Sequence, residues 1–443
     1  MCVLRQDQAA HEPPPAAEPW SLTTRFRPVA ATGGVPLMDI AERYGTPAYV
    51  VDEADVRGRC RAFRAALPDA DILYAAKAFL CRAMATWIRQ EGLGLDVCSG
   101  GELAIARSVG FPADRIVFHG NAKTPQELAE AVDYGVGRIV VDNLAEIPRL
   151  TALVPPGRRQ QVLLRIVPDI EAGAHTAIRT GGEDQKFGLS IVAGDAAAAV
   201  ARVLRQPELH LVGLHCHLGS QIFAAEPYER AVRVMVEQIA RVRDTYGIVL
   251  PQLDLGGGQG IAYLGTEHGL SPGDYARTVV KAMRERCAAL NLPVPRLTIE
   301  PGRSISGPAG LTLYRVIAVK RTLARTFVAV DGGMSDNPRP PLYGARYTAR
   351  LVGRRSAMSA CEVTLVGHHC EAGDVIAEQV PLPSDIRPGD VIAVPATGAY
   401  HHSMASTYNL TRRPPVIAVA DGAARVVVRR EELDDLLRRD VGL

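Results

Sequence analysis

Short apolar runs alternate with helix-patterned stretches between about residues 51 and 308 of the chain. Just before them, the stretch PLMDIAERYGTPAYVVDE at 36–53 predicts a short helix, a turn and a strand. Stretches such as GELAIARSVG and TPQELAEAVDYG have the apolar spacing of amphipathic helices. Such alternation of strands and helices is typical of a parallel sheet covered by helices.

Eight of the apolar runs are expected to be strands, and nearly all end in polar or glycine residues. They occupy 70–78, 94–100, 115–120, 138–143, 161–168, 209–220, 251–258 and 296–303. Eight strands with intervening helices predict a (β/α)8 barrel, in which catalytic groups lie at the carboxyl ends of the strands. A doubly wound open sheet is the alternative architecture.

The pattern changes on both sides of this barrel. After about residue 308, strand-like runs joined by Gly, Pro and Asp turns predict an all-β domain over 309–443, with a last helix near 430–440. At the other end, the Pro-rich residues 1–22 are expected to form a disordered leader. Residues 23–50 are expected to pack with the β domain, which leaves 51–308 for the barrel.

Composition narrows the classes of protein. The 443 residues are 47% hydrophobic with a formal charge of +2, which argues against a nucleic-acid or membrane-surface protein. No apolar run approaches the ~20 residues that span a bilayer. The chain begins without the apolar segment of a signal peptide, and its eight cysteines form no CxxC pair. These features predict a cytoplasmic protein with free thiols.

Candidate chemistry gathers at the ends of the expected strands. Lys77, in YAAKA, is either a lysine extending to solvent or a nucleophilic amine that forms a Schiff base. The run Gly256, Gly257 and Gly258 exposes backbone N–H groups to an anion, or simply forms a tight turn. In EPGRS, Glu300 and Arg303 either pair with each other or serve a ring nitrogen and an anionic group.

Histidines allow a rival interpretation. His215 and His217 stand two apart on an expected strand, so they should share one face, as a metal pair or with a ring-stacking role. With HHC at 368–370 and HH at 401–402, a zinc-dependent barrel hydrolase is conceivable. Further ligands would then come from other strand ends, namely Asp96, His119 and Asp142. That alternative leaves Lys77 and the glycine run unexplained.

Taken in order, the motifs resemble one family. YAxKA, DVCSGGEL, HGNxK, KFG, HxHxGSQ, LGGG, EPGR, RPxLY, HCExGD and GAY…YN are similar to the diaminopimelate decarboxylases from about Pro36 to the end of the chain. The resemblance implies an alanine-racemase-like barrel of pyridoxal-phosphate fold type III with a C-terminal β domain. It also implies pyridoxal 5′-phosphate as cofactor and no metal.

The resemblance also implies roles for the cofactor-binding residues. Lys77 matches the lysine that binds the cofactor as a Schiff base, His217 the imidazole stacked on its ring, and Glu300 the partner of its ring nitrogen. Ser220 and the glycines Gly256, Gly257 and Gly258 match the phosphate cradle. The remaining expected cofactor contacts are Asp96, Gly302, Arg303 and Tyr400.

The same resemblance assigns the substrate and its contacts. It implies decarboxylation of meso-2,6-diaminopimelate to L-lysine, with Cys370 as proton donor and Glu371 reading the distal ammonium. Arg303, Arg339, Tyr343 and Tyr400 would hold the rest of this amino-acid substrate. In the family Cys370 and Glu371 enter from the other subunit, which implies a homodimer with shared active sites.

Four departures leave a second substrate open. Arg179, Ala372, His401 and His402 differ from the residues expected at their positions. They leave room for a decarboxylase of a related amino acid or amino-acid conjugate. A racemase fits less well because CEAGD supplies a donor from one side, and a non-catalytic pyridoxal-phosphate carrier is disfavoured by the intact β domain.

Overall fold

The computed structural model describes residues 19–27, 29–170, 172, 181–182 and 184–442. Most of the expected leader, and also Arg179, therefore lies outside the described residues. The chain divides into two compact units. The first contains residues up to 56, 261–268 and 306 onward, and the second contains 57–260 and 269–305. Among the described residues, no helix has the length and apolar character needed to cross a membrane.

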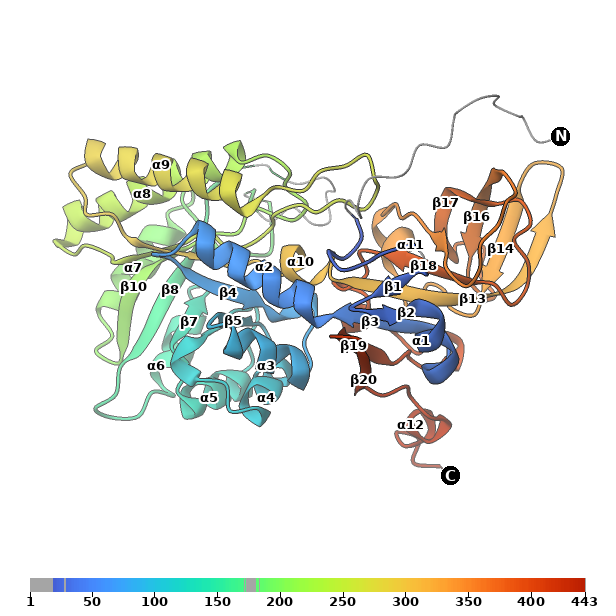
Figure 1. Cartoon of the computed structure of the whole chain (residues 1–443). Helices are drawn as coiled ribbons and strands as arrows, with labels where there is room; N and C mark the ends of the chain where they lie inside the picture. The colour runs from blue at the N-terminus through green and yellow to red at the C-terminus, as the bar shows by residue number, and fades with distance from the viewer. Residues whose placement is uncertain (1–18, 28, 171, 173–180, 183, 443) are drawn as a thin grey trace. The chain divides into compact units, whose positions relative to one another are not determined.

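The second unit is a closed parallel barrel (Figure 1). Its strands are β4 (Asp71–Ala75), β5 (Gly94–Val97), β6 (Ile116–Phe118), β7 (Arg138–Val141), β8 (Gln160–Val167), β10 (Leu209–His215), β11 (Gln252–Asp254) and β12 (Arg296–Ile299). Each strand pairs in parallel with its neighbours, β8 joins β10, and β12 returns to β4. This closed ring confirms the predicted (β/α)8 barrel and excludes the open sheet. The short β9 (Leu189–Ser190) extends β8.

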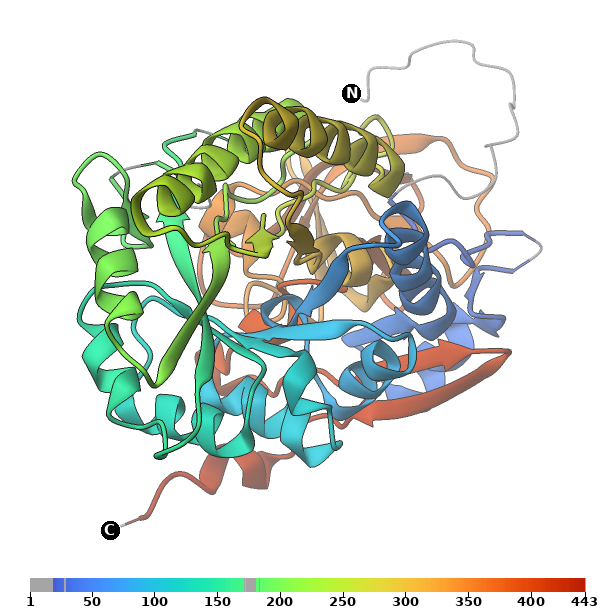
Figure 2. The ribbon, with the colours of Figure 1, turned by 90° about the vertical axis from the view of Figure 1, so that its left-hand side faces the viewer.

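Helices surround the ring of strands (Figure 2). They are α2 (Glu53–Ala66), α3 (Arg82–Gln90), α4 (Gly100–Ser108), α5 (Pro125–Tyr134), α6 (Glu146–Thr151), α7 (Asp195–Leu204), α8 (Glu226–Tyr246), α9 (Pro272–Ala289) and α10 (Arg303–Ser306). Local sequence sets their ends. In α5, Thr124 and Glu127 form a reciprocal capping box, and Gly135 ends the helix in the left-handed conformation.

The barrel interior is filled by branched aliphatic side chains. One buried cluster takes a single residue from each of five strands: Leu73, Val117, Val140, Leu163 and Val212. Barrels of this type are packed inside rather than hollow. The interior therefore leaves the strand ends as the place where polar side chains can meet.

The first unit is built on a mixed sheet with the order β17-β16-β14-β13-β3-β19-β20. Its strands are β1 (Ala31–Thr32), β2 (Val35–Pro36), β3 (Ala48–Asp52), β13 (Gly310–Arg321), β14 (Thr326–Val330), β15 (Arg350–Leu351), β16 (Ala360–Val366), β17 (Val375–Pro383), β18 (Val391–Pro395), β19 (Val416–Ala420) and β20 (Ala423–Val428). Strand β3 precedes the barrel in sequence, yet it pairs antiparallel with β13 and parallel with β19.

Three helices accompany this sheet: α1 (Leu37–Tyr44), α11 (Arg339–Tyr343) and α12 (Leu433–Leu437). The last helix is shorter than the expected 430–440. Strand β17 was not among the predicted strands, because exposed Glu378 and Gln379 interrupt its apolar residues. Buried residues on β13, β14, β16, β17 and β18 nevertheless form one core with Tyr263 and Tyr347.

Candidate active site

Lys77 lies in a short turn, Ala76–Ala78, directly after β4. Its Nζ is 2.9 Å from the Oδ2 atom of Asp96, a residue of the neighbouring strand β5. The Lys77 side chain is 39% exposed, whereas that of Asp96 is 1% exposed. The amine is thus aimed at a buried carboxylate instead of extending to solvent, and the ion pair offsets the cost of bringing its charge into the barrel mouth.

Glu300 follows β12 and is buried between two histidines from other strand ends. Its Oε1 is 2.6 Å from His119 Nε2, and its Oε2 is 3.6 Å from His215 Nε2. Burial raises the pKa of Glu300, but the two histidines outweigh it and hold this pKa well below its usual value. Of the two rings, His119 lies nearer to Glu300 and contributes more to this lowering. Glu300 is therefore an ionised carboxylate at neutral pH.

His217 does not share a strand face with His215, which corrects the expectation from their spacing. Strand β10 ends at His215, so His217 lies two residues beyond the end of the strand. The N–H of Gly257 donates to His217 Nδ1 at 3.2 Å. Burial, followed by the charge of Lys77, holds the pKa of His217 well below its usual value. His217 is therefore a neutral ring fixed against the glycine run.

The glycine run has no room for side chains. A Cβ on Gly257 would lie 2.2 Å from the carbonyl oxygen of Glu300. Gly258 has a φ of +103°, and its Cβ would lie 2.3 Å from the carbonyl oxygen of Gly219. These contacts bring the loop against the ends of β10 and β12, where backbone groups are available to an anion.

Three further predicted residues join this end of the barrel. Arg303 donates from Nη2 to Ser220 Oγ at 2.9 Å. A Cβ on Gly302 would lie 2.9 Å from the Cβ of Ala75, at the end of β4. A hydroxyl, a guanidinium and the glycine run thus gather beside the strand that leads to Lys77.

Apart from Arg303, the residues expected to hold the distal part of the substrate lie in the first unit. Arg339 begins α11 and is buried, with Nη1 donating to the Tyr347 hydroxyl at 2.6 Å. Its guanidinium also lies 4.7 Å from the ring centre of Tyr263. Tyr343 ends the same helix and is partly buried. Tyr400 is partly buried and has a φ of +60°, an uncommon conformation for a side chain of its size.

Cys370 and Glu371 occupy an exposed turn between β16 and β17. The buried Asp374 fastens this turn by accepting the backbone N–H groups of Met334 at 2.6 Å and His369 at 2.8 Å. The Tyr408 hydroxyl donates to Glu371 Oε2 at 2.8 Å. The turn therefore has a fixed base and presents a thiol and a carboxylate at the surface of its unit.

Sequence reasoning did not assign cofactor roles to His119, His215 or Asp254. They meet Glu300, with one ligand atom of each of the four residues within 4.8 Å of the others. Their signal was present, since each is a polar residue at the end of an apolar run. Sequence alone did not show that Glu300 would be their shared partner.

This geometry also bears on the zinc alternative. Two ligands on one zinc ion, with bonds of about 2.1 Å, stand roughly 3.4 Å apart. The 2.6 Å separation of His119 Nε2 and Glu300 Oε1 is shorter than that and is a direct contact between the two side chains. Of the expected pair, His215 belongs to the group around Glu300, whereas His217 is not part of that group.

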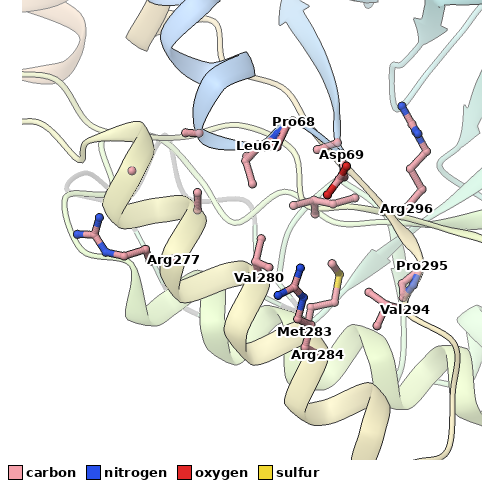
Figure 3. Close-up of a pocket in the computed structure, with 15 residues that line it drawn as sticks. Leu67, Pro68, Asp69, Arg277, Val280, Met283, Arg284, Val294, Pro295 and Arg296 are labelled. Atoms are coloured by element: carbon pink, nitrogen blue, oxygen red, sulfur yellow. The ribbon is translucent and has the colours of Figure 1, made fainter.

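A pocket of about 710 Å³ lies at the opposite end of the barrel, where β4 and β12 begin. Figure 3 shows Arg277, Val280, Met283 and Arg284 of α9 on one side of it. The described residues that line this pocket include no lysine, histidine or cysteine. The candidate active site is therefore at the carboxyl ends of the strands.

The residues at that end fit pyridoxal 5′-phosphate. An amine on Lys77 suits a Schiff base with an aldehyde, and an ionised Glu300 suits a protonated ring nitrogen. The glycine run leaves open backbone beside Ser220 and Arg303, which suits a phosphate. His217 offers a flat neutral ring between these groups.

Comparisons with known proteins agree with this geometry. Residues 53–307 match the family described as pyridoxal-dependent decarboxylase, pyridoxal binding domain. The diaminopimelate decarboxylase of Actinosynnema pretiosum subsp. auranticum is 56% identical over 423 residues, 95% of each chain. The crystal structure of diaminopimelate decarboxylase from M. jannaschii is 29% identical, with a TM-score of 0.90 over 96% of this chain and 98% of that one.

A third relative was solved with a bound amino acid. The diaminopimelate decarboxylase of Helicobacter pylori, complexed with L-lysine, is 31% identical, with a TM-score of 0.82 over 91% of this chain and 98% of that one. Together these matches confirm the resemblance found in the motifs, and with it pyridoxal 5′-phosphate as the cofactor. The chain is a pyridoxal-dependent decarboxylase and belongs to the family of diaminopimelate decarboxylases.

Proposed function

We propose that this enzyme removes one carboxylate of meso-2,6-diaminopimelate as carbon dioxide and leaves L-lysine, the last step of a lysine-forming route. Family membership and the pairing of Lys77 with Asp96 at the barrel mouth support this proposal. When bound, pyridoxal phosphate supplies an electron-accepting ring that delocalises the electron pair left by the departing carbon dioxide.

The barrel residues hold the cofactor in this proposal. Lys77 would bind its aldehyde group, Ser220 and the glycines Gly256, Gly257 and Gly258 would hold its phosphate, and His217 would contact its ring. Glu300 keeps the ring nitrogen protonated, a task supported by its ionised state between His119 and His215. The remaining proposed contacts are Asp96, Gly302, Arg303 and Tyr400.

Cys370 then returns a proton to the carbon that lost carbon dioxide. A thiol, with an ordinary pKa of ~8.5, keeps its proton at neutral pH and can give it up in the reaction. Its exposure on the β16–β17 turn supports access to a substrate. The carbon that receives the proton becomes a CH2 group, so the configuration of the lysine product is that of the distal, unreacted centre.

The distal amino-acid group of the substrate determines specificity. Arg303, Arg339 and Tyr343 are suited to its carboxylate, and Glu371 to its ammonium. A substrate with only a distal amine would leave the buried Arg339 without an anion. Polar pockets reject such substrates strongly because their buried charges remain unpaired.

The active form is a homodimer in this proposal, with the partner subunit's Cys370 and the partner subunit's Glu371 completing each site. The exposed position of the turn supports this arrangement. We also propose a cytoplasmic location, which is supported by the free thiols of all seven cysteines in the described part of the chain.

A product assay tests the proposed reaction. Purified protein with pyridoxal phosphate is incubated with meso-diaminopimelate, or with L-ornithine as the matched substrate that lacks a distal carboxylate, and products are measured by mass spectrometry. Lysine formed in proportion to enzyme and cofactor is the expected result. A coloured protein that gives no lysine would contradict the proposed substrate and favour a related amino acid or amino-acid conjugate.

A further inference from the structure

Asp254 is a buried carboxyl group to which the proposed mechanism gives no task. It ends β11 and is 0% exposed. Its Oδ1 accepts the backbone N–H of Gly256 at 2.8 Å, so it fixes the first residue of the glycine run. No N–H or O–H group of the described residues donates to its other oxygen, Oδ2, which is also buried.

Glu300 is the neighbour that can explain why the Oδ2 atom of Asp254 has no donor. The carboxyl groups of Asp254 and Glu300 lie within 4.8 Å of each other inside the cluster with His119 and His215. Two buried carboxyl groups this close do not both ionise readily, because each charge opposes the other. One of the two must keep a proton, and a protonated oxygen needs an acceptor where a bare carboxylate would need a donor.

The surroundings decide which of the two keeps it. Glu300 has two histidine partners, and these hold its pKa below its usual value in spite of burial. Burial, followed by the charge of Glu300, raises the pKa of Asp254 well above its usual value. The proton therefore resides on Asp254. Its Oδ2 atom, to which no described group donates a hydrogen bond, can then donate this proton to the Glu300 carboxylate.

Backbone contacts also join the glycine run to Glu300. The N–H of Glu300 donates to the carbonyl oxygen of Gly256 at 2.9 Å. The Gly257 backbone approaches the Glu300 carbonyl so closely that no Cβ fits between them. A shift of the glycine run would thus move Glu300, and Asp254 is the side chain that bonds to the run and lies within 4.8 Å of the Glu300 carboxylate.

We propose that Asp254, as a neutral carboxylic acid, is a positioning residue that ties the phosphate-binding glycine run to Glu300, the partner of the cofactor ring nitrogen. The proposal rests on the proposed function only in placing the cofactor phosphate at the glycine run and its ring nitrogen at Glu300. Asp254 touches neither the substrate nor the reacting carbon. It sets the spacing between the groups that hold the two ends of the cofactor.

Two substitutions separate a neutral donor from a charge. Asp254→Asn keeps an acceptor for Gly256 and an N–H donor for Glu300, whereas Asp254→Ala removes both. Affinity for pyridoxal phosphate is measured by titrating cofactor-free protein, and the visible absorbance of the bound cofactor is followed across pH. Asp254→Ala should weaken affinity about tenfold or more and shift the absorbance profile along the pH axis. Asp254→Asn should stay within about threefold of the parent protein, with an unshifted profile.

The opposite results would overturn the proposal. If Asp254→Asn is as damaging as Asp254→Ala, the residue acts as a charge and not as a neutral donor. If Asp254→Ala leaves affinity and profile unchanged, the link has no effect on the cofactor. Because no substrate is present, these readouts are independent of whether diaminopimelate is the substrate.

Glu146→Gln is the matched control. Glu146 is a fully buried carboxylate of the same barrel, paired with Lys123 at 2.8 Å and outside the cluster around Glu300. This substitution should lower the thermal midpoint but leave cofactor affinity and the absorbance profile as they are. If it instead reproduces the cofactor defect of Asp254→Ala, that defect reflects general loosening of the barrel, and the proposal fails.

Discussion

The barrel mouth and the turn that carries Cys370 differ in how far their polar residues are exposed. At the barrel mouth, Glu300 is 2% exposed and Asp96 is 1% exposed, and each is held by partners from other strand ends. On the turn, Cys370 and Glu371 are exposed, and Asp374 fixes the base beneath them. The residues proposed to bind the cofactor ring nitrogen and the amine are buried, whereas the proposed proton donor is left at a surface.

This difference suggests a division of labour that mutation can test. Changes at the barrel mouth should affect cofactor binding and turnover together. Changes on the turn should affect turnover or substrate affinity while the cofactor stays bound and coloured. The two regions are therefore distinguished by reading absorbance and kinetics on the same samples.

The largest effect is expected for Lys77→Ala. Removal of the amine that binds the cofactor should lower turnover by about 10³-fold or more and abolish the visible absorbance of the protein. Lysine formation and an absorption spectrum give both readouts. Lys281→Ala, on the exposed face of α9, is the control and should change neither. Substantial activity in Lys77→Ala would sink the assignment of this lysine.

Cys370→Ala should reduce kcat by about 10²-fold, the usual contribution of a positioned proton donor. The absorbance of the bound cofactor should remain, because the barrel mouth is intact. Cys361→Ala, on β16 of the same unit, is the matched thiol control. Unchanged kcat in Cys370→Ala would exclude this thiol as the donor. Loss of the visible absorbance would show that a change on the turn also affects cofactor binding, contrary to the proposed difference between the two regions.

A smaller effect is expected for Glu371→Gln. Loss of a charged partner for the distal ammonium should raise KM for diaminopimelate about tenfold while kcat changes less. Steady-state kinetics separate the two parameters. Glu378→Gln, an exposed carboxylate on β17, should leave KM as it is. A fall in kcat at constant KM would show that Glu371 acts in the chemistry and not in recognition.

The smallest effect concerns a histidine outside the proposed machinery. Burial lowers the pKa of His402 to about 4. Unfolded chains take up this proton below pH ~6.5 while the folded protein does not, so His402 destabilises the fold increasingly as pH falls from 6.5 towards 4. His402→Phe keeps a ring beside Tyr49 but cannot titrate.

The thermal midpoint of His402→Phe should consequently fall less on acidification than that of the parent protein, by about a few degrees between pH 7 and pH 4.5. Thermal unfolding at both pH values measures this difference. Equal losses in the two proteins would show that this histidine does not titrate as its burial implies.

The sequence was most informative where local pattern and tertiary structure agree. All eight barrel strands were predicted, because a strand buried on both faces is a short apolar run with a clear end. Strand β17 was missed because its exposed positions break that pattern with Glu378 and Gln379. Motif order was sufficient to indicate the family and its cofactor.

Partnerships between strand ends were harder to predict. His119, His215 and Asp254 were visible as polar residues, but nothing local shows that they converge on Glu300. That convergence depends on the closing of the ring between β12 and β4, and on where each strand stops. The separation of His215 from His217 has the same cause, since the strand ends two residues too early for both to share its face.

The close approach of Gly257 to Glu300 predicts how this protein tolerates sequence drift. Gly257 has an ordinary backbone conformation, yet even alanine would place a carbon 2.2 Å from the Glu300 carbonyl oxygen. Gly265, by contrast, has nothing within 4 Å of such a carbon. In a saturation library, Gly265 should accept many residues and Gly257 almost none. The position of Glu300 is thus protected from evolutionary change by a neighbour that has no side chain.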